Sequence, residues 1–218
     1  MHKVYAFDAY GTLFDVHAAV RRHRGLIAGD CDALSELWRA KQLEYSWTRA
    51  LMGAYRDFAE LTEQALDFAI RRRGGVSEAA RAALLSAYRT LDAFPDVVPA
   101  LRALKDRGAL VCVFSNGSPD MLSSAIAASG LAPVLDAAIS VDAAQTFKTA
   151  PETYQLVTRR YGVAPAEVSF QSSNRWDIAG AVRFGFRSVW INRQNAPDEY
   201  QDLPPAAIVG DLGGLLSL

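Results

Sequence analysis

The run VYAFDAYGTLF, residues 4–14, constrains the fold of this chain more than any other feature. Apolar residues lead directly into Asp8, and a Gly-Thr pair begins three residues later. A short apolar run that is followed by a glycine is typical of a buried parallel strand and its exit turn. Ligands of an open α/β sheet bind just beyond the carboxyl ends of such strands. Asp8 therefore either caps the next turn or takes part in chemistry at this edge.

The second half of the chain continues this pattern. After residue 94, apolar runs alternate with helical segments, which predicts βαβ units and a parallel sheet with helices on both faces. The predicted strands cover residues 110–114, 137–141, 168–170, 188–191 and 207–209.

Between residues 15 and 93, nearly every segment is predicted to be helical. Leu34, Trp38 and Tyr45 follow the spacing of an amphipathic helix. Thr62 is expected to cap the next helix and Ser77 the one after it. We therefore predict an α/β fold with a Rossmann-like core of residues 1–14 and 94–218. A helical cap of residues 15–93 is inserted after the first strand, where it can close a site and exclude water.

The composition excludes several classes of function. Twenty-four acidic residues against 23 basic ones give a net charge of −1, so no positive field attracts nucleic acid or an anionic membrane. No apolar run approaches the ~20 residues of a membrane span, and the N-terminus lacks a signal-peptide pattern. Cys31 and Cys112, the two cysteines, belong to no metal-binding motif. We expect a cytoplasmic protein without a metal or another cofactor.

Polar side chains follow the predicted strands at four places. In chain order they are Asp8 with Thr12, Ser115 with Asn116, Lys148, and the run Ser172, Ser173 and Asn174 with Asp177. Each alone has a structural alternative, namely a turn, a surface lysine or a carboxylate in the first turn of a helix. Together they are expected to converge on one crevice, because the carboxyl ends of parallel strands share one edge of the sheet.

The chemistry of these groups suits a covalent mechanism. A carboxylate such as Asp8 is a competent nucleophile if it is held near an electrophilic carbon and kept ionised, and Lys148 would keep it ionised. Hydroxyls and turn amides suit an anionic group of a substrate. Asp177 could then activate a water molecule for a later hydrolytic step.

The chain resembles the haloacid dehalogenase superfamily in four motifs that occur in the same order: Asp8-x-x-Gly11-Thr12, Ser115-Asn116-Gly117, Lys148 and Asp177. Phosphatases of that superfamily carry a second Asp two places after the nucleophile. This chain has Tyr10 there, and a phenol with a pKa of about 10 is a poor acid for a leaving group. Phosphatases also place adjacent carboxylates for Mg²⁺ near the last motif, where residues 172–177 hold only Asp177. A halide leaving group needs neither a proton nor a metal, so both departures favour dehalogenation.

The closer resemblance is to the L-2-haloacid dehalogenases, and it covers nearly the whole chain. The most specific match is the cap segment 37–47, LWRAKQLEYSW. The other matches are segments 7–15 and 115–122, the pair Phe147-Lys148 with Tyr154, and residues 172–174 with Asp177. Two positions depart from that family: Ala40 replaces a larger polar residue, and Thr149-Ala150 separate Lys148 from the following proline.

This resemblance implies the hydrolysis of short L-2-haloalkanoic acids to 2-hydroxy acids with inversion. Chloroacetate, 2-chloropropionate and fluoroacetate are the expected kinds of substrate. Asp8 would attack the α-carbon and displace the halide, and water would then hydrolyse the ester. Arg39 and Asn116 would stabilise the departing halide, with the ring of Trp176 beside it. Ser115 and nearby backbone amides would hold the substrate carboxylate.

The resemblance also implies supporting roles. Lys148 would pair with Asp8, and Tyr154 and Ser172 would support that charge network. Thr12 belongs to the candidate catalytic set as part of the first motif. Asn174 and Asp177 would handle the hydrolytic water. The candidate apolar walls are Tyr10, Leu43, Phe58 and Trp176. The family implies a homodimer. The haloacid substrate and the halide ion are the other expected partners, and neither nucleic acid nor a membrane is expected.

Two other functions stay open from the residues alone. One is a phosphatase of the same superfamily that acts on a small phosphate ester, against which Tyr10 argues. The other is a non-catalytic relative that binds a small carboxylate or a partner, although every residue that the chemistry needs is present. The sequence defines neither the preferred halogen nor the chain length.

Overall fold

The computed structural model describes residues 2–218 and contains one six-stranded parallel sheet with the strand order β3-β2-β1-β4-β5-β6. The strands are β1 (Val4–Phe7), β2 (Leu110–Ser115), β3 (Ala137–Ser140), β4 (Val168–Ser172), β5 (Arg187–Ile191) and β6 (Ala207–Val209). Every neighbouring pair of strands is parallel. The predicted α/β fold is confirmed, with the strands at the predicted places.

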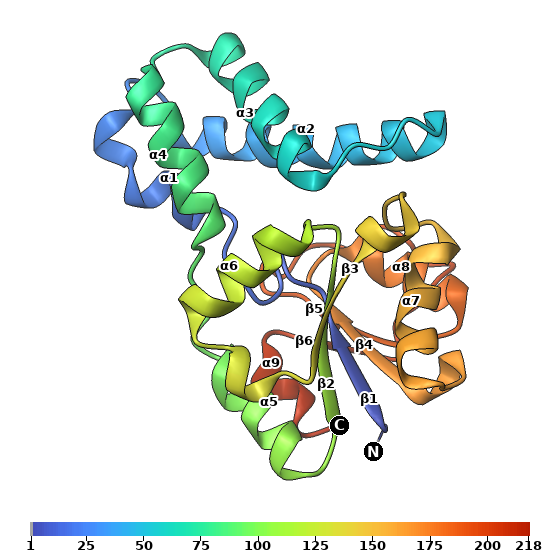
Figure 1. The fold of residues 1–218 in the computed structure, drawn as a ribbon. Coiled ribbons are helices and arrows are strands. Elements are labelled where there is room, and N and C mark those ends of the chain that lie inside the picture. Colours follow the sequence, from blue (N-terminus) through green and yellow to red (C-terminus); the bar gives the residue numbers. More distant parts are fainter. Residues whose placement is uncertain (1) are drawn as a thin grey trace.

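Strand β1 lies inside the sheet, between β2 and β4 (Figure 1). All four of its residues are buried, which explains why β1 is a continuous apolar run rather than an alternating one. The chain continues from β1 to β2 on one side and returns later to β4 on the other side. The crevice beyond the end of β1 is therefore a topological switch point, where α/β sheets bind ligands. Asp8 lies there, and its backbone N–H donates to the carbonyl of Gln171 at 2.9 Å.

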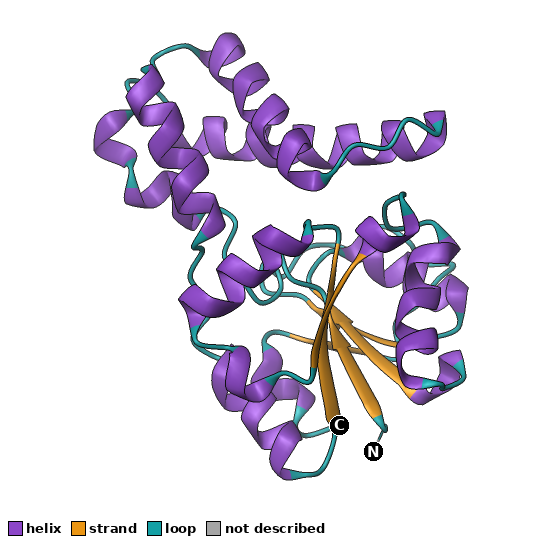
Figure 2. Ribbon diagram, in the orientation of Figure 1, coloured by secondary structure: helices purple, strands orange, loops and turns teal. Residues whose placement is uncertain are grey.

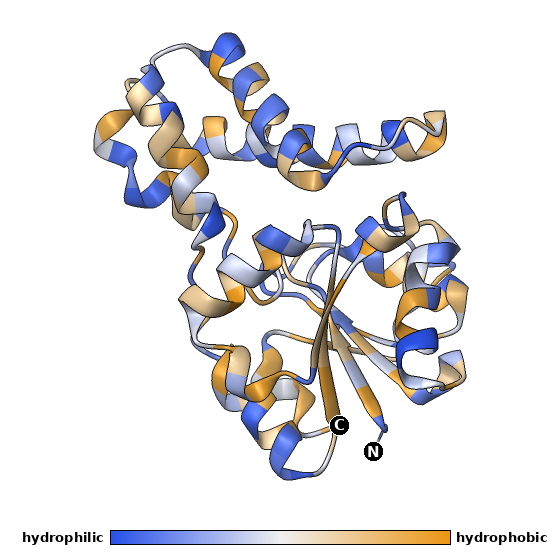
Figure 3. Cartoon of the chain, viewed as in Figure 1, coloured by the Kyte–Doolittle hydropathy of each residue, from blue (hydrophilic) through white to orange (hydrophobic). Residues whose placement is uncertain are grey.

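Helices cover both faces of the sheet. They are α5 (Val97–Asp106), α6 (Pro119–Ser129), α7 (Pro151–Tyr161), α8 (Arg175–Phe184) and α9 (Leu212–Leu215), with single-turn helices η2 (Ala132–Val134), η3 (Val141–Ala144) and η4 (Pro165–Glu167). Figure 2 shows α5 and α9 on one face and α7 and α8 on the other. Along the helices, orange apolar segments alternate with blue polar ones (Figure 3). The buried apolar residues of the strands and of these helices form a core between the layers.

A second group of helices lies above the carboxyl edge of the sheet (Figure 1). It consists of α1 (Ala18–Arg22), η1 (Arg24–Leu26), α2 (Cys31–Met52), α3 (Phe58–Arg73) and α4 (Glu78–Arg89). The two connections to the sheet run side by side, because Asp15 N–H donates to Asp92 at 3.0 Å and Phe94 N–H donates to Leu13 at 3.0 Å. Ser77 caps α4 as predicted, by accepting the N–H of Ala80.

The predicted cap at Thr62 is wrong. Helix α3 begins four residues earlier, at Phe58, and Asp57 caps it by accepting the N–H of Glu60 at 2.9 Å. Thr62 lies one turn inside the helix, where its hydroxyl donates to the carbonyl of Phe58 at 2.7 Å. A threonine hydroxyl can bond either an N–H at a helix start or a carbonyl of the preceding turn, and the sequence pattern did not distinguish the two.

One site residue lies differently from the prediction. Lys148 does not follow a strand directly, because η3 separates it from β3. Helix α8 begins at Arg175, so Asp177 lies in the first turn of a helix. Both residues stand at the same edge of the sheet. Among residues 2–218, no helix combines the length and the apolar composition needed to cross a membrane.

Candidate active site

Asp8 is held by donors from three parts of the chain. Its Oδ2 accepts from Thr12 Oγ1 at 2.8 Å, from Asn174 Nδ2 at 2.8 Å and from Ser172 Oγ at 3.3 Å. Its Oδ1 accepts from Lys148 Nζ at 3.1 Å. The carboxylate is therefore fixed in orientation. Oδ1 has one donor where Oδ2 has three, so Oδ1 is the less encumbered of the two oxygens.

Lys148 is almost fully buried, which is unusual for a lysine. Its ammonium also donates to Asp177 Oδ2 and to the carbonyl of Phe114, both at 2.8 Å. It lies 4.2 Å from the centroid of the Phe114 ring. Three hydrogen bonds account for all three protons of the ammonium group. Lys148 is therefore fixed between two carboxylates and is not free to turn toward solvent.

Asp177 is completely buried and accepts from Lys148 on one oxygen and from Tyr154 Oη on the other, at 2.8 Å. Burial raises the pKa of Asp177 to about 6, against the lowering effect of Lys148; the negative charge of Asp8 raises it further. Burial also raises the pKa of Tyr154 well above its ordinary value, so its phenol remains a donor. A carboxylate with a pKa near neutrality is suited to accept a proton from water.

The loop after β4 is tied to the loop after β1. Ser173 N–H donates to Thr12 Oγ1 at 2.7 Å, and Asn174 Nδ2 donates to the carbonyl of Tyr10 at 3.1 Å as well as to Asp8. Between Tyr10 and Thr12, Gly11 has a φ of +93°, which a side chain rarely adopts. The Gly-Thr pair of the first motif thus allows the turn that brings the two loops into contact.

The turn after β2 supplies the third side of the site. Ser115 and Asn116 are both buried. Ser115 Oγ accepts the N–H of Gly117 at 3.0 Å, and Asn116 Oδ1 accepts the N–H of Lys148 at 3.0 Å. Because the oxygen of the Asn116 amide is used in this way, its NH₂ group is oriented away from Lys148 and can donate elsewhere. Ser115 and Asn116 therefore lie where the sequence predicted, next to the Lys148 segment.

Arg39 lies on α2, in the group of helices above the carboxyl edge of the sheet, and its side chain reaches the site from there. Its Nη2 donates to the carbonyl of Tyr10 at 3.2 Å. No carboxylate within residues 2–218 forms an ion pair with it, although twelve other ion pairs occur there. The two carboxylates of Asp8 and Asp177 face the single ammonium group of Lys148. The positive charge of Arg39 brings the net charge of these four side chains to zero. A half-buried cation without a carboxylate partner is suited to hold an anion.

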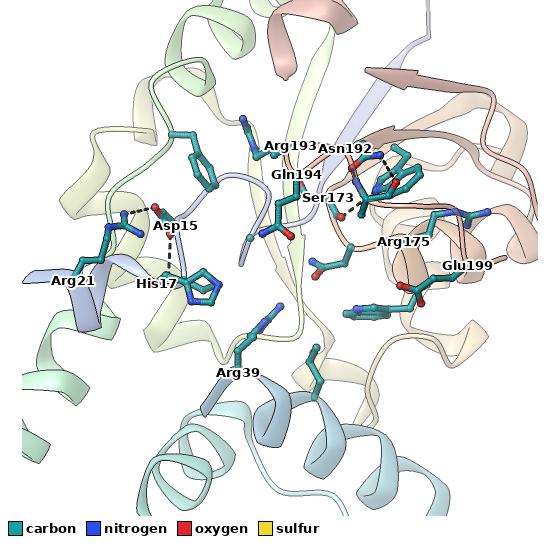
Figure 4. Close-up of a pocket in the computed structure, with 18 residues that line it drawn as sticks. Asp15, His17, Arg21, Arg39, Ser173, Arg175, Asn192, Arg193, Gln194 and Glu199 are labelled. Carbon is teal, nitrogen blue, oxygen red and sulfur yellow. Dashed lines mark hydrogen bonds and ion pairs between the residues drawn. The ribbon is translucent and has the colours of Figure 1, made fainter. Parts of the chain in front are cut away.

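A cavity of about 550 Å³ lies between α2 and the loops that follow β4 and β5. Arg39, Leu43, Asn174 and Trp176 line it, and Figure 4 shows Arg39 pointing into it toward Gln194 of the opposite wall. Ala40, the neighbour of Arg39, is exposed and does not line this cavity. The departure at Ala40 therefore leaves the cavity wall unchanged.

The aromatic residues of the predicted walls fall into two groups. The Tyr10 ring lies parallel to that of Tyr88, with centroids 5.6 Å apart, and 6.0 Å from that of Phe58. Both residues are buried, and neither Tyr10 nor Phe58 is among the residues that line the 550 Å³ cavity. Trp176 lines the cavity, and its ring meets the ring of Trp47 on α2 edge to face, with the ring centroids 5.4 Å apart.

Several cavity residues were not identified from the sequence. His17, Gln194 and Glu199 line the same cavity as Arg39. His17 Nδ1 lies 2.7 Å from Ser35 Oγ, and burial lowers the pKa of His17. These residues belong to no motif, and only the folding of distant segments brings them together, so no sequence signal could have identified them. In the part of the chain that the structure describes, no cluster of His, Cys, Asp and Glu has the arrangement of a metal site.

Residues 2–185 match the family model of the haloacid dehalogenase-like hydrolases. The chain is 47% identical to (S)-2-haloacid dehalogenase 4A of Burkholderia cepacia, over 97% of this chain and 92% of that protein. It is 48% identical to (S)-2-haloacid dehalogenase 1 of Pseudomonas sp. strain CBS-3, over 97% of this chain and 94% of that protein.

Solved structures agree with the sequence comparisons. A crystal structure of a dehalogenase superposes with a TM-score of 0.97 at 45% identity, covering 99% of this chain and 96% of that one. The L-2-haloacid dehalogenase of Xanthobacter autotrophicus with chloropropionic acid covalently bound superposes with a TM-score of 0.90 at 37% identity, covering 100% and 98%. The predicted family resemblance is confirmed.

Proposed function

Because the chain belongs to the haloacid dehalogenase-like hydrolases and, within them, to the (S)-2-haloacid dehalogenases, we propose that it hydrolyses short L-2-haloalkanoic acids to 2-hydroxy acids of inverted configuration. The observation that carries this proposal is the Asp8 carboxylate, which is buried, fixed by four donors and paired with Lys148. Such a carboxylate can attack a carbon atom without first losing a proton.

In the first step, an Asp8 oxygen attacks the α-carbon of the haloacid. The new C–O bond forms as the carbon–halogen bond breaks, and the bonding pair leaves with the halide. We infer that Oδ1 attacks, because its single hydrogen bond leaves it the more available oxygen. Arg39 and the NH₂ group of Asn116 would stabilise the departing halide, and Trp176 would shield it. The turn at Ser115 would bind the substrate carboxylate through its hydroxyl and backbone amides.

In the second step, water attacks the carbonyl carbon of the Asp8 ester. Asp177 accepts the proton of that water, which is consistent with its raised pKa, and Asn174 orients the water from beside Asp8. The bond between the carbonyl carbon and the ester oxygen then breaks, and the leaving alkoxide takes up the proton held by Asp177 to become the hydroxyl of the 2-hydroxy acid. The second proton of the water is released to solvent, which regenerates the Asp8 carboxylate. Asp8 thus gains one oxygen atom from water, and isotopically labelled water can trace this transfer.

The direct test is halide release from L- and D-2-chloropropionate, each with EDTA and with added Mg²⁺. We expect metal-independent chloride release from the L enantiomer alone, with D-lactate as the product. In ¹⁸O water, a single turnover should place the label in Asp8. The alternative, a phosphatase of the same superfamily, is not favoured; rapid Mg²⁺-dependent phosphate release from simple esters, without halide release, would overturn the proposal.

The range of substrates is also part of this proposal. Chloroacetate is an expected substrate, since a relative from Moraxella sp. that is 40% identical over 91% of this chain is named a haloacetate dehalogenase. Defluorination of fluoroacetate would require close contacts from Arg39 and Asn116, because fluoride is the smallest halide.

We also propose that the protein is a homodimer, consistent with the exposed apolar side chains of Trp47, Leu51 and Met52 on α2. We propose a location in the cytoplasm, consistent with the two buried free cysteines. Sedimentation equilibrium tests the dimer.

A further inference from the structure

Tyr10 carries a hydroxyl whose hydrogen bonds the protein does not supply. The side chain is 3% exposed, and its oxygen has no hydrogen-bond partner among residues 2–218. A buried hydroxyl normally has a partner, because the hydrogen bonds that it made to water are otherwise lost. The neighbouring Tyr88 illustrates the usual case, since its hydroxyl donates to Gln42 Oε1 at 3.2 Å. An unpartnered buried hydroxyl calls for a physical account.

The position of this hydroxyl provides one. The phenol end of Tyr10 lies over Gly117, where a Cβ atom would come 2.7 Å from Cε2 and 3.2 Å from the hydroxyl oxygen. Gly117 therefore permits an approach that any side chain would block. Gly117 belongs to the turn whose N–H donates to Ser115 Oγ, and this turn is the proposed binding site for the substrate carboxylate.

Neighbouring residues fix the ring in this position. Tyr88 lies against one side of Tyr10 with an interplanar angle of 8°, and the centroid of Phe58 is 6.0 Å away. The backbone carbonyl of Tyr10 accepts from Arg39 and from Asn174. The hydroxyl therefore cannot swing out to solvent.

The chemistry of the phenol suits an anionic acceptor. Burial raises the pKa of Tyr10, and the nearby phenol of Tyr88 raises it further, so the group stays a neutral O–H donor. A hydrogen bond from a neutral donor to an ionised oxygen is shorter and stronger than one between neutral groups. A haloacid brings two candidate acceptors: its carboxylate and the halide that leaves.

Building on the proposed function, we propose that the Tyr10 hydroxyl donates a hydrogen bond to the carboxylate of the bound haloacid and that this ring is more than an apolar wall. The carboxylate is favoured over the halide because the hydroxyl lies at the Gly117 turn. Arg39, the proposed halide ligand, meets Tyr10 at the backbone carbonyl instead.

The test compares Tyr10→Phe with Tyr161→Phe. Tyr161, at the C-terminal end of α7, has a buried hydroxyl beside the buried thiol of Cys112, which is a weak hydrogen-bonding group, so this substitution removes a similar hydroxyl outside the site. For each protein, D-lactate and bromide are measured as inhibitors of L-2-chloropropionate turnover. D-lactate carries the carboxylate without a halide, and bromide is a halide without a carboxylate. Calorimetry of D-lactate binding gives a second measurement that does not depend on turnover.

We expect Tyr10→Phe to weaken D-lactate binding and to raise KM about tenfold, the usual size of the loss of one hydrogen bond to a charged group. Bromide inhibition should be unchanged, and Tyr161→Phe should match the wild type in every measurement. Weaker bromide inhibition with unchanged D-lactate binding would assign the hydroxyl to the halide and overturn the proposal.

Other outcomes are equally decisive. Unchanged binding of both inhibitors to Tyr10→Phe, or the same loss in Tyr161→Phe, would also overturn the proposal. If the wild-type protein releases no halide from any haloacid, the proposed function fails. In that case, calorimetry of D-lactate binding to the wild type and to Tyr10→Phe still tests whether the Tyr10 hydroxyl binds a carboxylate, because it does not depend on turnover. Thermal unfolding of both variants checks the fold, and removal of an unpartnered hydroxyl should leave the melting temperature unchanged or raise it.

Discussion

The molecule contains two buried polar clusters that differ in charge. The site cluster consists of Asp8, Lys148 and Asp177, in which one ammonium group serves two carboxylates. The cap cluster consists of Gln42, Thr62 and Tyr88, and it is neutral. In it, Gln42 Nε2 donates to Thr62 Oγ1 at 3.0 Å and its Oε1 accepts from Tyr88.

The difference shows what each cluster is built to do. Within the cap cluster every group has a partner, so it fixes the packing of α2 against α3 and α4 and offers nothing to a ligand. The site cluster keeps an unbalanced carboxylate, and beside it lie a cation without an ion pair, Arg39, and a hydroxyl without a partner, Tyr10. A substrate anion with a leaving group can complete such a set.

The largest effect is expected from Asp8→Asn. An amide is too weak a nucleophile to displace halide, so turnover should fall by about 10⁴-fold or more. The fold should survive, because Lys148 keeps its bonds to Asp177 and to the carbonyl of Phe114. Halide release and thermal unfolding measure the two effects separately. Substantial residual activity would remove Asp8 from the role of nucleophile.

Lys148→Met should destabilise the site cluster far more than Gln42→Leu destabilises the cap cluster. Loss of the ammonium leaves two buried carboxylates without a counter-ion, at a cost of about 3–5 kcal/mol in the free energy of unfolding. Gln42→Leu leaves only neutral groups unpaired, at about 1–3 kcal/mol.

The pH dependence of the two variants should also differ. In Lys148→Met the folded-state pKa of the carboxylates is raised, so the folded state binds protons more tightly than the unfolded state. Its stability should therefore recover as the pH falls. The defect of Gln42→Leu should be independent of pH. Denaturant unfolding at several pH values makes this comparison, and parallel pH profiles for the two variants would contradict it.

Arg39→Ala should slow carbon–halogen cleavage by about 10²–10³-fold, the usual loss for one charged or hydrogen-bonding group that stabilises a leaving anion. Ester hydrolysis should change much less, because no halide is present in that step. Rapid quench and mass measurement of the Asp8 ester separate the steps. Arg24→Ala is the control, since Arg24 pairs with Asp32 on the surface and lies outside the site. Equal slowing of both steps would contradict the halide role.

A smaller effect is expected from pH. Asp177 has a folded-state pKa of about 6, above the ordinary value of about 4. Ester hydrolysis needs its ionised form, so the rate should fall about tenfold per pH unit below pH 6 and level off above it. Because the pKa is raised on folding, the Asp177 contribution to stability is greatest at low pH and is lost as the pH rises through 6. Single-turnover decay of the Asp8 ester provides the rate, and a flat profile between pH 4.5 and 6 would exclude Asp177 as the base.

The strands and most helix ends could be predicted from the sequence because local rules determine them. The apolar run before Asp8 and the glycine after it specify a buried strand and a turn within eight residues. Ser77 was predicted as an N-cap from its position alone. Thr62 was misassigned because two local hydrogen bonds compete for the same hydroxyl, and only the surrounding packing selects one.

The candidate site was predictable in composition and not in geometry. The order of motifs identified Asp8, Lys148 and Asp177, yet their contacts join residues 140 and 29 positions apart in the chain. Arg39 was singled out only through the family resemblance, since on an amphipathic helix it would ordinarily be a surface residue. His17 and Gln194 were missed, because they meet Arg39 only through the folded arrangement of three segments.

By itself, then, the sequence determined which polar residues follow the strands and at which edge of the sheet they stand, since the hydrophobic periodicity and the order of strands along the chain follow from local pattern. Tertiary structure alone decided burial, and with it charge balance and hydrogen bonding. It buried Lys148 between two carboxylates and raised the pKa of Asp177. It also left the Tyr10 hydroxyl over Gly117 without a partner. Desolvation and pairing depend on neighbours that are distant in the chain, so no local pattern encodes them.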